Sequence, residues 1–107
     1  MKQLAIVNRR SGGIQSPARL DWLLVQLARS GCEPVFTEQP GHARELAAQA
    51  RCERVVVAGG DGTLSEVLSG MDLDSQSLAL IATGRGNSLA RDLGLYPIEF
   101  GVRALAA

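Results

Sequence analysis

The feature that most constrains the fold is a regular alternation of short apolar runs with helical patterns along all 107 residues. The apolar runs, each typical of a strand, cover residues 4–7, 34–37, 54–58 and 78–82. The helical patterns cover residues 17–30, 42–51, 64–71, 88–93 and 98–105. Strands that alternate with helices pair in parallel, so this order predicts an α/β fold. We expect a three-layer α/β/α, Rossmann-like domain with a parallel sheet of about four or more strands.

Local signals support this assignment. Ser16 followed by Pro17 is typical of a helix N-cap and first helical residue, and Gly31 is expected to end that helix. Pro34 is expected at the entry of its strand. Residues 55–57 are three valines, and apolarity without alternation indicates a strand buried on both faces.

Composition limits the classes of function. The chain is 46% hydrophobic, and its eleven basic and eleven acidic residues cancel, which argues against binding to nucleic acid. The apolar runs are too short to span a bilayer, and there is no basic amphipathic helix, so we expect at most peripheral membrane contact. Cys32 and Cys52 have no metal-ligand spacing. We interpret them as reduced, buried residues of a cytoplasmic protein.

Seven of the twelve glycines lie in three loops, each directly after a predicted strand. They are Gly12 and Gly13, then Gly59, Gly60 and Gly62, and finally Gly84 and Gly86. The carboxyl ends of parallel strands share one edge of a sheet, so the loops should converge there. Glycine lets backbone N–H groups approach an anion, and each following helix adds the positive end of its dipole. Glycine is also common in such turns, but the polar residues beside these glycines favour a phosphate-binding rim.

Asp61 is the unusual residue of the second loop. A carboxylate would repel a phosphate, so we expect it to bind Mg²⁺ or to act as a general base. The alternative is that Asp61 only caps the following helix. Glu66, five residues on, either supports the same site or is a solvated helix residue. The chain has a single lysine, Lys2, and no P-loop, GxSxG or complete GxGxxG motif, so a phosphate clamp must use arginine or backbone N–H groups.

Four segments together resemble one family. Residues 59–67, GGDGTLSEV, are similar to the GGDGTxxEV motif of the diacylglycerol kinase catalytic-domain family, which includes bacterial lipid kinases and sphingosine kinases. Residues 8–12 resemble its NPxSG loop, Thr37 with residues 41–43 its T…GHA segment, and residues 81–91 its PLGTGNxxAR segment. NAD kinases share the GGDGT-type loop.

The resemblance implies the ATP-binding domain of a lipid kinase, which transfers the γ-phosphate of ATP, with Mg²⁺, to a diacylglycerol-like lipid hydroxyl. Asp61 would hold the metal and act in catalysis, supported by Glu66. The nucleotide would be bound by Asn8, Ser11, Thr37, Gly59, Gly60, Gly62, Thr63, Gly84, Arg85, Gly86 and Asn87. Arg85 stands where the family usually has threonine, and it either clamps a phosphate or blocks the pocket.

Family enzymes have a second, mainly β domain that supplies much of the lipid pocket, and residues 1–107 contain no counterpart. We therefore expect a single nucleotide-binding domain that is inactive alone and meets its lipid acceptor through the missing domain. Two alternatives stay open. The chain could be a non-catalytic nucleotide-binding or dimerising interaction module, or it could be an NAD kinase-like enzyme. In the first case, apolar surface left by the missing domain would form a homodimer.

Overall fold

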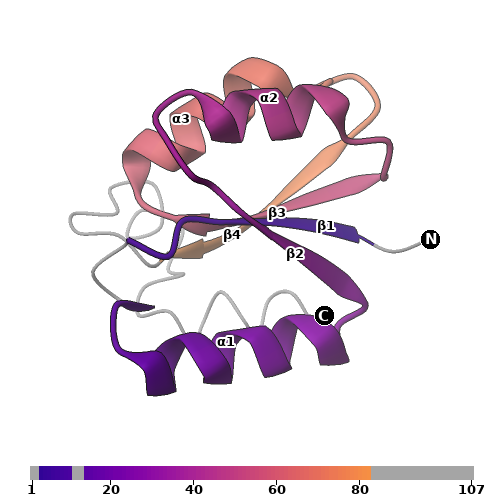
Figure 1. Ribbon diagram of the computed structural model, residues 1–107. Helices are drawn as coiled ribbons and strands as arrows, with labels where there is room; N and C mark the ends of the chain where they lie inside the picture. The colour runs from indigo at the N-terminus through magenta and orange to yellow at the C-terminus, as the bar shows by residue number, and fades with distance from the viewer. Residues whose placement is uncertain (1–2, 11–13, 83–107) are drawn as a thin grey trace.

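Four parallel strands form the centre of the described part of the chain, residues 3–10 and 14–82, in this computed structural model (Figure 1). The strands are β1 (Gln3–Val7), β2 (Cys32–Phe36), β3 (Arg54–Gly59) and β4 (Ser77–Ala82). Three helices connect them: α1 (Pro17–Arg29), α2 (His42–Gln49) and α3 (Asp61–Gly70). Helix α1 covers one face of the sheet, and α2 and α3 cover the other. The predicted α/β class and its three layers are confirmed.

The strand order is β2-β1-β3-β4. After β1 the chain first forms β2 on one side of β1. It then returns to form β3 on the other side of β1. Such a change of direction opens a crevice at the carboxyl ends of the two strands, where parallel sheets bind ligands. Here the Asn8 N–H donates to the Ala58 carbonyl oxygen at 2.9 Å, which holds the loop after β1 against the end of β3.

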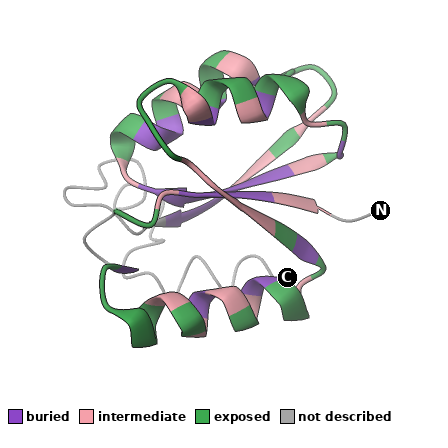
Figure 2. Cartoon of the chain, viewed as in Figure 1, coloured by how far each residue is buried: buried purple, intermediate pink, exposed green. Residues whose placement is uncertain are grey.

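The core consists of two apolar clusters, one on each face of the sheet (Figure 2). Strand β3 takes part in both. Val55 and Val57 pack in the cluster that includes residues of α2 and α3, whereas Val56 packs in the cluster that includes residues of α1. All three valines are fully buried, so the prediction of a strand covered on both faces is confirmed.

The helix signals around α1 are also confirmed. The Ser16 hydroxyl oxygen accepts a hydrogen bond from the Arg19 N–H at 3.1 Å, and Pro17 is the first helical residue. Gly31 follows the end of the helix with a φ of 74°, the left-handed conformation that glycine adopts without strain.

Several predicted boundaries are wrong. Strand β2 begins at Cys32, so Pro34 lies inside it, opposite Ala5. An edge strand tolerates proline because one of its sides needs no ladder hydrogen bonds. Helix α2 ends at Gln49, since the next residue is extended, and α3 begins at Asp61 rather than at residue 64. The helices predicted over residues 88–93 and 98–105 lie outside the described residues.

Both cysteines are buried and free, as predicted. Cys32 packs in the cluster on the α1 face and Cys52 in the cluster on the opposite face. Burial raises the pKa of the Cys32 thiol, although Arg54 opposes this change. A raised pKa keeps the thiol protonated and unreactive near neutral pH. Within residues 3–10 and 14–82, no helix combines the length and apolarity needed to cross a bilayer.

Candidate functional site

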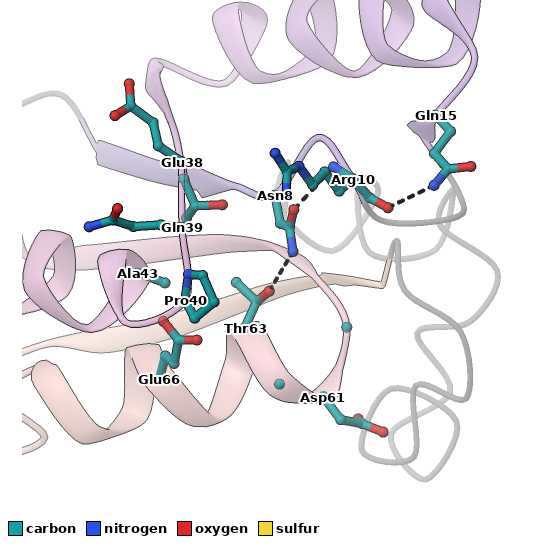
Figure 3. A pocket seen from close by; sticks show the side chains of 13 residues that line it. Asn8, Arg10, Gln15, Glu38, Gln39, Pro40, Ala43, Asp61, Thr63 and Glu66 are labelled. Atoms are coloured by element: carbon teal, nitrogen blue, oxygen red, sulfur yellow. Dashed lines mark hydrogen bonds between the residues drawn. The ribbon is translucent and has the colours of Figure 1, made fainter.

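A cavity of about 680 Å³ lies at the carboxyl ends of the strands (Figure 3). Its walls come from the loops after β1, β2 and β3 and from the first turns of α2 and α3. The lining residues are Asn8, Arg10, Gln15, Thr37, Glu38, Gln39, Pro40, Ala43, Gly60, Asp61, Gly62, Thr63 and Glu66. Its volume is in the range of pockets that hold a small molecule.

Most of the predicted site residues within the described ranges line this cavity. They are Asn8, Thr37, Gly60, Asp61, Gly62, Thr63 and Glu66. Gly59 does not line it but packs beneath the side chain of Thr63. Ser11, Gly84, Arg85, Gly86 and Asn87 lie outside the described residues. Three of the four motif segments thus contribute to one cavity.

Asn8 and Thr63 connect two walls of the cavity, the loop after β1 and the first turn of α3. The Asn8 side-chain amide donates to the Thr63 hydroxyl oxygen at 3.2 Å, and its carbonyl oxygen accepts from the Arg10 N–H at 3.0 Å. The Asn8 side chain is partly buried and the Thr63 side chain is buried. These bonds keep the loop after β1 in a defined position relative to the first turn of α3.

Gly59 and Gly62 of the GGDGT segment differ in the space that a side chain would find at each position. A Cβ atom at Gly59 would lie 2.7 Å from the Thr63 Cβ and 2.9 Å from its hydroxyl oxygen, so any side chain there would displace Thr63. A Cβ atom at Gly62 would meet no atom within 4 Å, and Gly62 lines the cavity. Gly59 is therefore explained by packing, whereas packing does not require a glycine at position 62.

Asp61 is the first residue of α3, and it is exposed and lines the cavity. The N-cap position of α3 is Gly60. Asp61 follows it and therefore does not occupy the N-cap position that the alternative gave it. The first turn of α3 instead brings a carboxylate and the positive end of the helix dipole to the same wall.

Asp61 and Glu66 do not converge. Five residues of helix separate them by about 140° around the axis, and Figure 3 shows the two carboxylates pointing apart. No group of three or more His, Cys, Asp or Glu side chains that could hold a metal ion exists among the described residues. Mg²⁺ commonly takes only one or two carboxylates and completes its shell with water and phosphate oxygens, and the exposed Asp61 fits that requirement.

Glu66 makes a specific contact with the neighbouring helix. Its side chain is partly buried, and its Oε1 accepts a hydrogen bond from the Gly41 N–H at 3.0 Å. Gly41 is the N-cap of α2. The alternative that Glu66 is merely a solvated helix residue is therefore wrong.

Sequence reasoning missed several lining residues. Arg10 is the only basic residue that lines the cavity among residues 3–10 and 14–82. Its backbone is held from both sides, by the Asn8 side chain and by the Gln15 amide at 3.0 Å. Glu38, Gln39 and Pro40 follow Thr37 in the loop after β2. The rule that ligands bind at the carboxyl ends of parallel strands would have found them, but this loop lacks the clustered glycines that drew attention to the others.

Comparisons with known proteins identify the family of this chain. A family model described as diacylglycerol kinase catalytic domain matches residues 2–105. The Bacillus subtilis protein YtlR is 37% identical over 71 residues, which are 60% of this chain and 23% of that protein. A diacylglycerol kinase of the same organism is 41% identical over 56 residues, which are 50% of this chain and 18% of that protein.

Solved structures are similar over nearly the whole chain. A crystal structure of a diacylglycerol kinase from Bacillus anthracis str. Sterne matches with a TM-score of 0.81 and 28% identity, covering 98% of this chain and 41% of that one. The matched segments thus cover less than a quarter of each curated relative, and the chain covers about two fifths of this solved protein. The resemblance carried by the four motif segments is confirmed, and the chain belongs to the diacylglycerol kinase catalytic domain family.

Proposed function

We propose that this chain is the ATP-binding domain of a lipid kinase that transfers the γ-phosphate of ATP to a diacylglycerol-like hydroxyl. The observation that carries the proposal is the meeting of three motif segments in one cavity. Asn8, Thr37 and residues 60–63 all line it, and the first turn of α3 forms part of its wall. A helix N-terminus with close backbone N–H groups is suited to bind phosphates.

Asp61 is the residue that would hold Mg²⁺ in this proposal. The metal would neutralise phosphate charge, and without it the carboxylates that line the cavity would repel ATP. Arg10 and the backbone N–H groups of residues 60–63 would provide the remaining positive potential. Ser11, Gly84, Arg85, Gly86 and Asn87 belong to the proposed nucleotide site through their motifs alone.

The lipid acceptor belongs to the remainder of the enzyme in this proposal. Residues 1–107 would be a single nucleotide-binding domain without phosphotransferase activity of its own, because they span a minor part of the family's proteins. The balanced charge and the free, buried cysteines support a cytoplasmic chain that does not bind nucleic acid.

A calorimetric titration of ATP into this chain, with and without Mg²⁺, tests the nucleotide-binding function. We expect saturable binding of one Mg²⁺-ATP per chain and much weaker binding of metal-free ATP. NAD should not displace Mg²⁺-ATP in competition. Displacement by NAD would favour an NAD kinase-like activity. Absence of nucleotide binding, together with a dimer by light scattering, would favour an interaction module.

A further inference from the structure

Residues 37–41 connect β2 to α2 and are called here the β2–α2 wall, because residues 37–40 line the cavity. Hydrogen bonds fix this wall at both ends. The Thr37 N–H donates to the Val7 carbonyl oxygen at 3.0 Å, which attaches the wall to the end of β1. The Glu38 N–H donates to the His42 Nδ1 at 3.0 Å, which attaches it to the first residue of α2.

The bond from Gly41 to Glu66 attaches the same wall to α3. It joins positions 25 residues apart in sequence. Helix α3 carries residues 61–63 of the proposed phosphate-binding segment in its first turn. Glu66 therefore connects α3 with the β2–α2 wall, which comes from a different loop.

The backbone geometry explains why Gly41 needs a partner from outside its own helix. Gly41 has a φ of 87°, a left-handed conformation that side-chain-bearing residues rarely adopt. As an N-cap without a side chain, it offers α2 no side-chain capping bond. The Glu66 carboxylate places an acceptor and a negative charge at this helix N-terminus, which is the favourable position for both.

We infer that Glu66 is a positioning residue whose hydrogen bond to Gly41 sets the β2–α2 wall relative to the phosphate-binding turn of α3. It acts as an acceptor for a backbone N–H, rather than as a metal ligand or a proton-transfer group. The direction of the Asp61 carboxylate agrees with this, because it points away from Glu66. The expected consequence for nucleotide affinity rests on the proposed function, but the attachment of the wall does not.

Two substitutions at Glu66 separate the acceptor from the charge. Glu66→Gln keeps a carbonyl oxygen for Gly41 and removes the charge, whereas Glu66→Ala removes both. We expect the Kd for Mg²⁺-ATP to stay within about threefold for Glu66→Gln and to rise about tenfold or more for Glu66→Ala. Glu45→Ala is the matched control, because it removes an exposed carboxylate from the first turn of α2 that does not line the cavity. Its Kd should equal that of the unchanged chain.

Hydrogen exchange of the Gly41 amide, followed by NMR, reads the bond without any nucleotide. Gly41 is exposed, so its protection depends on the bond to Glu66. Exchange should be about 10- to 100-fold faster in Glu66→Ala and nearly unchanged in Glu66→Gln and Glu45→Ala. Unchanged Gly41 protection in Glu66→Ala would overturn the inference.

Loss of affinity in Glu66→Gln with Gly41 still protected would also overturn the inference, because the charge would then be what matters. Absence of Mg²⁺-ATP binding to the unchanged chain would contradict the proposed function instead. In that case the predicted exchange pattern at Gly41 would still support the attachment of the wall by Glu66.

Discussion

Asp61→Ala should weaken the binding of Mg²⁺-ATP by about 100-fold, which corresponds to about 2.7 kcal/mol. The physical reason is that the exposed Asp61 carboxylate lies at the cavity, where it would otherwise face the phosphates with a like charge. Its contribution is favourable only when a divalent cation lies between the two anions. Asp61→Asn should lose nearly as much, because an amide oxygen is a weaker ligand for Mg²⁺.

In a titration without Mg²⁺, the same substitutions should not weaken the binding of ATP. This difference makes the prediction specific to the metal. Without Mg²⁺, both Asp61 variants should bind ATP as tightly as the unchanged chain or more tightly, because a repulsive charge has been removed. Thermal unfolding provides the control for folding. A carboxylate in the first turn of α3 contributes only about 0.3–1 kcal/mol to helix stability. Equal loss of affinity with and without Mg²⁺ would contradict a metal-binding role for Asp61.

Gly70→Ala should lower the free energy of unfolding by about 3 kcal/mol, which is a large part of the stability of a small domain. Gly70 is the last residue of α3, where the helix packs closely on α2. A Cβ atom there would lie 3.0 Å from the Arg44 carbonyl carbon and 3.2 Å from the Ala48 backbone nitrogen, and still closer to the Arg44 carbonyl oxygen. Backbone atoms cannot rotate away as a side chain can, so the two helices must separate.

Gly62→Ala is the matched control for stability, because it makes the same substitution in the same helix. A Cβ atom at Gly62 would meet no atom within 4 Å. Alanine should therefore leave stability unchanged or raise it by about 0.5–1 kcal/mol, as expected from helix propensity. Denaturant unfolding measures both variants. A Gly70→Ala chain as stable as Gly62→Ala would contradict the close approach of α2 and α3.

The layers of the fold and the edge that carries the site could be predicted because both depend on local patterns. The uninterrupted apolar run at residues 55–57 indicated a strand covered on both faces, and it is fully buried. Asn8, Thr37 and residues 60–63 each follow a strand, and the parallel sheet brings them to one cavity. This reasoning needs only strand direction and the positions of strand ends.

The remaining features depend on contacts between distant residues, which no local pattern reports. Gly59 was predicted to bind the nucleotide together with Gly60 and Gly62, yet its lack of a side chain makes room for Thr63. Glu66 looked like a partner of Asp61, yet it accepts a bond from Gly41 on another helix. Pro34 looked like the entry of a strand, and only its place on an edge strand makes an interior position acceptable.

The central claim is that the cavity at the carboxyl ends of β1, β2 and β3 binds the nucleotide. The most direct test is an NMR titration of Mg²⁺-ATP into the isotope-labelled chain, which follows every backbone amide. The account predicts that the largest shift changes occur at Asn8, Thr37 and residues 60–63, which line that cavity. Changes centred instead on residues 72–76 and Glu53, at the opposite edge of the sheet, or no changes at all, would contradict it.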